Sequence, residues 1–195
     1  MSTVEEAIAA LRAGKPVVLP FDTVYGLAAR EDEESVRRLY ELKGRGAQQP
    51  TALVAHDTRS LAERIPELET ELLLRGPFTL IVPNPGRRFP WLTGENRDAI
   101  GVRLPELTGP TAEVLAAVRV VVATSANHPG GADPKRLEEV PEDIRTGAGA
   151  VIDGGDLPGT PSTVVDVTGV EPRILREGAV QTSDVLARIT SSRRA

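Results

Sequence analysis

Apolar and polar positions recur along this chain at helical spacing in some segments and as short unbroken apolar runs in others. Near the N-terminus, Val4, Ile8 and Leu11 form one stripe of a predicted helix whose start carries the capping pattern Thr3–Glu6. Further helices are predicted at 32–43, in two short pieces of 57–75 divided near position 66, at 111–118 and at 183–189. Apolar runs predict strands at 17–19, 51–55, 79–82, 99–104, 120–123, 150–153, 163–167 and 173–176.

Predicted helices and strands are interleaved, which favours an α/β fold. Several strand-to-strand connections hold no helical pattern, so we expect a mixed parallel and antiparallel sheet. We expect one domain over residues 1–195, with its core at about 4–190 and a frayed tail at 191–195.

Composition narrows the possible chemistry. The chain has 195 residues, no cysteine and a net charge of −5, which excludes disulfides, thiolate metal sites, cysteine catalysis and nucleic-acid binding by bulk charge. No apolar run is long enough to cross a membrane, and the N-terminus has no secretory pattern, so we expect a cytoplasmic protein. Phosphate-loop, dinucleotide-loop and metalloprotease motifs are missing, and only His56 and His128 are present. A histidine triad or histidine-rich metal site is therefore poorly supported.

Polar clusters follow or interrupt the apolar runs instead. Asp22, Thr23, Tyr25 and Gly26 follow the first strand as a hydroxyl-rich turn, a place where α/β folds bind small ligands, although an ordinary loop fits equally well. Lys43, Gly44 and Arg45 end a predicted helix. Capping of the helix dipole is the simpler interpretation, and phosphate binding is the functional one.

The later clusters follow the same pattern. Thr79 opens a strand after a Gly-Pro turn, and Arg103 interrupts an apolar strand, where it needs an anion if it is buried. Residues 123–127 leave another strand with several hydrogen-bonding groups. Ser162 enters a late strand and Arg176 closes the last one. Each cluster has the alternative explanation of a simple turn or a solvated edge.

In this order, the blocks resemble the YrdC/TsaC family of L-threonylcarbamoyl-AMP synthases. The matching segments are LPFDTVYGLAA, ELKGRGAQQP, RGPFTLIVP, AIGVRLP, VVATSAN, STVVDVTG and ILREGAV, from about position 15 to 180. The resemblance implies a YrdC-like twisted mixed sheet flanked by helices, with a concave basic cavity. It also implies that L-threonine, bicarbonate or CO2, and ATP give threonylcarbamoyl-AMP and pyrophosphate. The product would pass to a separate transferase that modifies tRNA.

The resemblance also assigns roles. Lys43 and Arg45 are expected to be catalytic. Residues expected to bind L-threonine are Thr23, Ser125 and Ser162. Residues expected to bind ATP are Arg45, Gln49, Thr79, Asn127, Lys135 and Arg176. Arg103 is expected as a further cation of the cavity. No protein metal site is expected, and Mg2+ would arrive with the triphosphate.

The chain departs from the family pattern at Phe21-Asp22, Gly46, Val54 and Lys135, which bears on amino-acid specificity more than on nucleotide chemistry. Three alternatives therefore stay open. One is a paralogue that makes another carbamoyl or acyl adenylate, as in the HypF proteins. Another is a non-catalytic module that binds double-stranded RNA by shape. The third is an α/β protein whose polar clusters are only turns.

Overall fold

The computed structural model describes residues 1–46, 48–73 and 75–192. In this part of the chain nine strands form one sheet in the order β7-β1-β2-β6-β3-β5-β4-β8-β9. The strands are β1 Val17–Pro20, β2 Tyr25–Ala29, β3 Ala52–Ala55, β4 Phe78–Pro83, β5 Ala99–Arg103, β6 Val120–Ser125, β7 Ala150–Val151, β8 Thr163–Asp166 and β9 Arg173–Arg176. The pairs β1/β7, β3/β5 and β4/β8 are parallel and the others antiparallel, which confirms the mixed α/β sheet.

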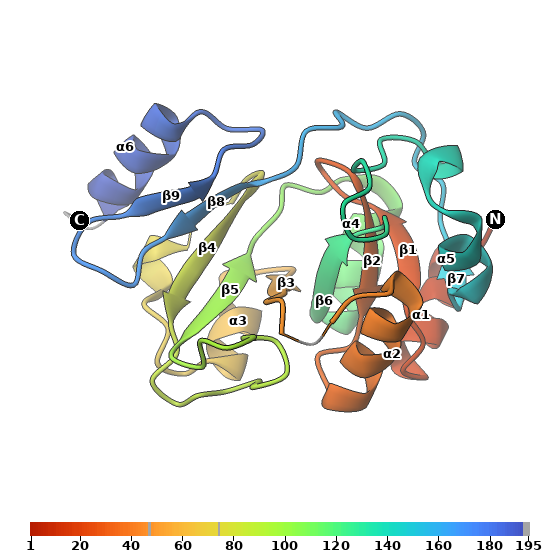
Figure 1. Cartoon of the computed structure of the whole chain (residues 1–195), viewed down its shortest axis with the longest axis horizontal. Coiled ribbons are helices and arrows are strands. Elements are labelled where there is room, and N and C mark those ends of the chain that lie inside the picture. Colours follow the sequence, from red (N-terminus) through yellow and green to blue (C-terminus); the bar gives the residue numbers. More distant parts are fainter. Residues whose placement is uncertain (47, 74, 193–195) are drawn as a thin grey trace.

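The helices are α1 Val4–Arg12, α2 Glu33–Lys43, α3 Thr58–Arg64, α4 Gly109–Val118, α5 Glu142–Gly147 and α6 Thr182–Ser192, with short 3-10 turns η1 Thr70–Leu72 and η2 Leu137–Glu139. In Figure 1 the two chain ends lie at opposite ends of the molecule, with α6 next to β9 and with α1 and α5 at the other end. The first two residues of the predicted tail belong to α6, and 193–195 lie outside the described residues.

Three elements differ from the sequence prediction. The second of the two helical pieces predicted within 57–75 is only the 3-10 turn η1, since the segment after position 66 is too short for an α-helix. Tyr25 and Gly26 were expected in a turn but begin strand β2, which pairs antiparallel with both β1 and β6. All five residues of β2 are buried, so the strand lacks the polar and apolar alternation by which a half-exposed strand is found. Helix α5 was not predicted, because six residues are too few to establish a helical period.

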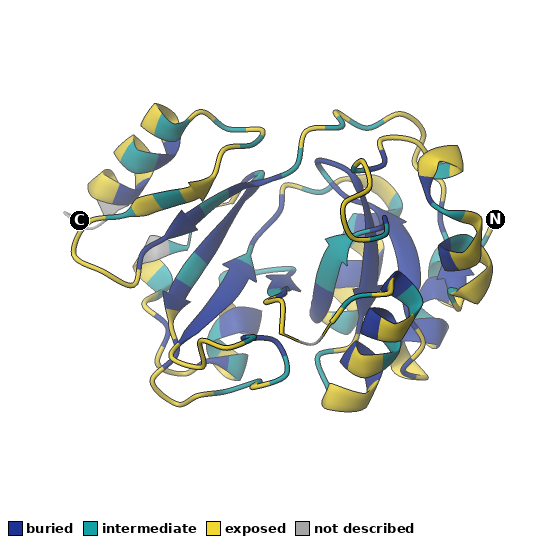
Figure 2. Cartoon of the chain, in the orientation of Figure 1, coloured by how far each residue is buried: buried dark blue, intermediate teal, exposed yellow. Residues whose placement is uncertain are grey.

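Alternate side chains of the strands enter two separate cores. Val120 and Val122 of β6 pack into the core that contains residues of α2, α3, α5 and α6, while Val121 points to the core that contains α1 and α4. This is the period of two that any strand imposes on its side chains. Figure 2 shows the central strands largely buried and the helices exposed on their outer faces.

The α1/α4 layer covers only one end of its face of the sheet. These two helices pack on each other, with contacts to β1, β7 and β6. On the same face, strands β3, β5, β4 and β8 contribute the cavity-lining residues Val54, Arg103, Thr79 and Val164. The layer therefore ends where the cavity begins, and the sheet becomes the floor of a site.

Candidate active site

The cavity on this sheet face has a volume of about 310 Å³ and gathers residues that are far apart in the sequence. The predicted site residues that line it are Thr23, Arg45, Thr79, Arg103, Ser125, Ser162 and Arg176. They come from β4, β5, β6 and β9 and from the segments that follow β1, follow α2 and precede β8. Such a convergence of polar groups on a partly apolar hollow is typical of a ligand site.

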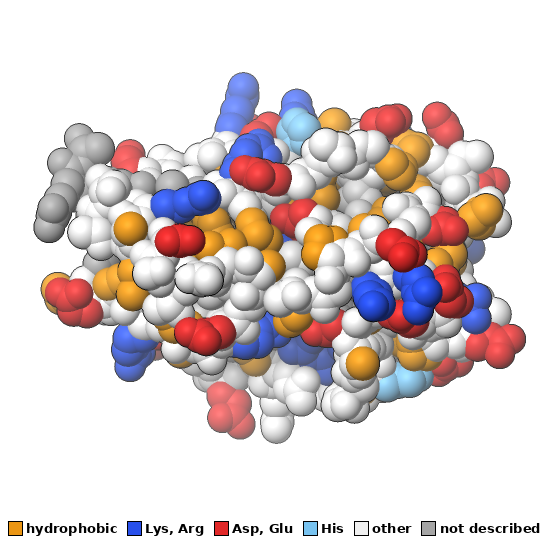
Figure 3. Space-filling view, turned by 90° about the horizontal axis from the view of Figure 1, so that it is seen from above, with side chains coloured by type: hydrophobic (Ala, Val, Ile, Leu, Met, Phe, Trp, Pro, Cys, Tyr) orange, Lys and Arg blue, Asp and Glu red, His pale blue; other side chains and the backbone are white. Residues whose placement is uncertain are grey.

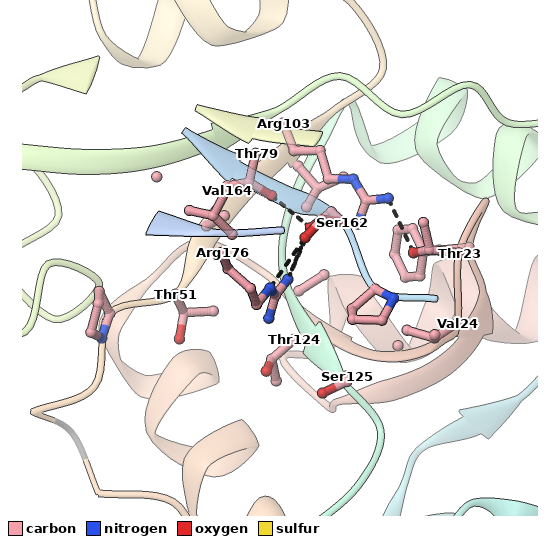
Figure 4. A pocket seen from close by; sticks show the side chains of 18 of the residues that line it. Thr23, Val24, Thr51, Thr79, Arg103, Thr124, Ser125, Ser162, Val164 and Arg176 are labelled. Carbon is pink, nitrogen blue, oxygen red and sulfur yellow. Dashed lines mark hydrogen bonds between the residues drawn. The ribbon is translucent and has the colours of Figure 1, made fainter. Parts of the chain in front are cut away.

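One wall is a hydrogen-bonded group of Thr79, Ser162 and Arg176, visible at the centre of Figure 4. The hydroxyls of Thr79 and Ser162 lie 3.1 Å apart. The Arg176 guanidinium donates to the Ser162 carbonyl at 2.7 Å and to the Ser162 hydroxyl at 3.2 Å. These bonds fix the direction of the guanidinium at the cavity wall.

Gly178 allows the segment after β9 to pack closely against the segment that contains Ser162. A Cβ at position 178 would lie 2.2 Å from the carbonyl oxygen of Pro161 and 2.5 Å from the carbonyl carbon of Ser162. The backbone of the segment after β9 therefore runs directly against the segment that presents Ser162. Ala179 donates its N–H to the Pro161 carbonyl at 2.8 Å, which joins the two segments just beyond Arg176.

A buried ion pair lies on the neighbouring strand β5, next to Thr79 of β4. Arg103 donates to the Asp22 carboxylate at 2.5 Å and to the Thr23 hydroxyl at 3.2 Å, and the side chains of Arg103 and Asp22 are only 12% and 9% exposed. Burial raises the pKa of Asp22 above its ordinary value, although the Arg103 charge opposes this. The Arg103 Nε is buried without a hydrogen-bond partner among the described residues.

Arg45 approaches the cavity from the loop after α2. Its guanidinium donates to the Thr124 hydroxyl at 3.0 Å and to the Pro50 carbonyl at 2.6 Å, and it lies 5.8 Å from the centre of the Tyr40 ring. Its Nε is also buried and unpartnered within the described part of the chain. Buried donors without acceptors cost free energy unless a ligand or water satisfies them, so both orphaned Nε groups favour an anionic ligand.

Lys43 does not line the cavity. It is buried, and its ammonium donates to the carbonyls of Ser125 and Asn127, both at 2.6 Å, and to the Asn127 side-chain oxygen at 2.9 Å. The Ser125 hydroxyl donates to the same Asn127 oxygen at 2.7 Å. Burial lowers the pKa of Lys43 to about 8, the Arg45 charge adds to this, and Asp133 opposes it. Lys43 thus clamps the end of β6, from which Ser125 enters the cavity.

The remaining predicted residues also lie off the cavity lining, namely Gln49, Asn127 and Lys135. Asn127 acts behind it, as the partner of Lys43 and Ser125. Lining residues that the sequence reasoning did not single out include Thr51, Thr124 and Asp133. Thr124 lies within the matching segment VVATSAN but was given no role of its own. Asp133 lies in the Gly-rich stretch after that segment, where the sequence carries no signal of a role.

His128 bridges two helices beside this clamp. Its Nδ1 lies 3.1 Å from the Lys43 carbonyl at the end of α2, and its Nε2 lies 3.1 Å from Asp143 in α5. The bond to the Lys43 carbonyl and the bond to Asp143 raise the pKa of His128 above 6.5.

We therefore expect His128 to stabilise the fold at low pH only. A raised folded-state pKa contributes stability below the unfolded value of about 6.5, and this contribution is lost as pH rises through the folded value. His128→Gln should lower the melting temperature at pH 5.5 and match the wild type by about pH 8.5. Asp143→Asn should shrink the low-pH difference. A difference that does not change with pH would contradict this assignment.

Two features are absent from the described residues. No group of three or more His, Cys, Asp or Glu side chains is arranged to hold a metal ion. None of the helices has the length and apolar character required to cross a bilayer.

Comparisons with known proteins agree with this geometry. A family model described as telomere recombination, Sua5_yciO_yrdC, matches residues 9–178. Threonylcarbamoyl-AMP synthase of Pyrococcus abyssi is 35% identical over 90% of this chain, which spans 54% of that relative. The enzyme of the same name from Pseudomonas syringae is 31% identical, over 90% of this chain and 97% of the relative.

A solved structure adds a ligand for a relative. P. abyssi Sua5 complexed with L-threonine superimposes with a TM-score of 0.84 and 31% identity, over 95% of this chain and 57% of that one. This chain thus spans little more than half of the P. abyssi protein. Sequence, cavity and comparisons agree that the chain belongs to the Sua5/YciO/YrdC family.

Proposed function

We propose that this protein is an L-threonylcarbamoyl-AMP synthase, a nucleotidyltransferase. It would make threonylcarbamoyl-AMP and pyrophosphate from L-threonine, bicarbonate or CO2, and ATP in the cytoplasm, for the threonylcarbamoyladenosine modification of tRNA by a separate transferase. The observation that carries the proposal is the meeting of Thr23, Arg45, Ser125, Ser162 and Arg176 in one cavity. The names of the relatives and the threonine bound to one of them support it.

The chemistry requires alignment rather than a covalent enzyme intermediate. Threonine's amine and CO2 form a carbamate, whose oxygen attacks the α-phosphorus of ATP. The bond from that phosphorus to the bridging oxygen breaks and pyrophosphate leaves. Negative charge spreads over the phosphoryl oxygens, so positioned cations and hydroxyls lower the barrier. This explains how a chain without cysteine can carry out the reaction.

Each wall of the cavity has a part in this scheme. Thr23, Ser125 and Ser162 would contact threonine, while Arg45 and Arg176 would contact the phosphates beside Thr79. Three arginines and one carboxylate are among the described lining residues, and Arg103 is paired with Asp22, so Arg45 and Arg176 would supply the positive charge that two anionic substrates need. Mg2+ would be held by phosphate and water, because hard oxygen ligands and retained waters suit this ion.

Pyrophosphate release with threonine, bicarbonate and Mg–ATP tests the proposal. The wild type should depend on all three, and Arg176→Ala should lower kcat/KM by about 100-fold, the usual effect of losing one charge-stabilising donor. Arg173→Ala is a matched control, since Arg173 lies on the same strand, is not a cavity-lining residue and pairs with Asp166.

Three results would contradict the proposal. ATP–pyrophosphate exchange that occurs with other amino acids but not with threonine would favour a paralogue that makes a different adenylate. RNA binding without ATP turnover would favour the RNA-binding module. The face seen in Figure 3 gives little support for that module, because its Lys and Arg side chains are interspersed with Asp and Glu. The absence of any ATP-dependent thermal shift would favour polar clusters that are only turns.

A further inference from the structure

Asp133 is the single carboxylate among the described residues that line the cavity, whose other charged lining groups are Arg45, Arg103 and Arg176. A carboxylate in such a place repels a triphosphate and a substrate carboxylate. It therefore needs a positively charged partner or a role that outweighs this repulsion.

Asp133 is linked through Asn127 to Ser125, one of the hydroxyls expected to bind the amino acid. The Asn127 amide donates to the Gly131 carbonyl at 2.7 Å and lies 3.4 Å from one Asp133 oxygen. The same Asn127 accepts from Ser125. Tyr25 donates its N–H to the Pro134 carbonyl at 2.8 Å, which ties the neighbour of Asp133 to the strand that follows Thr23.

Asp133 retains capacity for a ligand. A carboxylate accepts up to about four hydrogen bonds, and Asp133 has one long contact, on one oxygen, within the described part of the chain. The Asp133 charge acts on the pKa of Lys43, but the Lys43 ammonium donates its hydrogen bonds to Ser125 and Asn127 and not to Asp133. The second Asp133 oxygen receives no donor from the described residues.

A free α-amino acid carries an ammonium and a carboxylate on the same carbon. Arg103 lines the same cavity next to Thr23. It already pairs with Asp22, and its buried Nε, which has no partner among the described residues, is the group left to bind an anion. Asp133 offers the opposite charge near Ser125. A cavity with both signs recognises a zwitterion better than an uncharged or purely anionic analogue.

We propose that Asp133 binds the α-ammonium group of the amino-acid substrate and so makes the site selective for amino acids over hydroxy acids. This rests on the proposed function for the identity of the amino acid. It is independent of that function for the recognition itself, which needs no turnover.

The test measures binding by calorimetry, without ATP, of L-threonine and of 2,3-dihydroxybutanoate, in which a hydroxyl replaces the ammonium. Asp133→Asn, which keeps the shape and removes the charge, should weaken threonine binding by about 30-fold, the range expected for one charge-assisted hydrogen bond. Binding of the hydroxy acid and of a non-hydrolysable ATP analogue should change by less than about twofold. Asp133→Glu should keep part of the preference for the ammonium.

Asp156→Asn is the matched control, because Asp156 is exposed and is not a cavity-lining residue. Equal losses for threonine and the hydroxy acid would overturn the proposal in favour of a structural role. A raised Mg2+ requirement with unchanged threonine binding would overturn it in favour of metal contact. A wild-type protein that binds threonine with the predicted selectivity but releases no pyrophosphate would contradict the proposed function and still support this inference.

Discussion

Replacing Lys43 by methionine should abolish pyrophosphate release and lower the free energy of unfolding by about 3 kcal/mol. Methionine fills a similar volume, but it leaves the Ser125 and Asn127 carbonyls without the ammonium that now satisfies them, and the Asn127 side-chain oxygen keeps only the Ser125 hydroxyl. Unpaired buried acceptors carry their full desolvation cost. Without the clamp, the end of β6 loses the support that aims Ser125 into the cavity.

Urea denaturation and the pyrophosphate assay measure the two effects separately. Lys15→Met is the matched control, since Lys15 is exposed and lies outside the cavity lining, and it should behave like the wild type. A Lys43→Met protein that retained wild-type stability would show that the three short contacts are energetically neutral. Wild-type turnover would show that the clamp does not matter for the site.

The second large effect is expected for Gly178→Ala. The added methyl group would lie 2.2 Å from the Pro161 carbonyl oxygen and 2.6 Å from the Thr163 nitrogen, far inside van der Waals contact. The obstacles are backbone atoms, which cannot rotate away as a flexible side chain can. We expect the free energy of unfolding to fall by about 3 kcal/mol. We also expect kcat/KM to fall about as far as in Arg176→Ala, because Ser162 and Arg176 are forced apart.

Gly169→Ala, in the loop between β8 and β9, is the control. A Cβ there would meet only the Glu171 carbonyl oxygen at an ordinary 3.7 Å, so stability should change by less than about 0.5 kcal/mol. Equal unfolding curves for Gly178→Ala and Gly169→Ala would show that the close approach at Gly178 is relieved by a small backbone movement.

Sequence reasoning found most of the framework because apolar runs and helix caps are local signals. The capping box at Thr3 and Glu6, the left-handed Gly44 after α2 and the whole of β9 stand where they were predicted. Strand β2 was missed because burial on both faces removes the alternation that marks a strand. Strand β7 was predicted at 150–153, and its pairing with β1 covers only residues 150 and 151.

The candidate site could be predicted as a set of residues but not as a geometry. Lys43 and Arg45 are two positions apart, yet one turns into the interior as a clamp and the other reaches the cavity. No periodicity distinguishes them, because the C-cap at Gly44 reverses the chain between them. Asp133 was missed for a related reason: its place depends on how a Gly-rich loop folds back onto Asn127 and Tyr25.

The parallel pairing of β4 with β8 joins residues 78–81 to residues 163–166, and β9 follows only after that. A chain still emerging from the ribosome can therefore form the α1/α4 layer long before it has an Arg176 wall. Pairing over such sequence separations is slow, since the loop between the strands must be closed first. The cavity lined by Thr79, Ser162 and Arg176 would therefore be complete only after β9 has been synthesised.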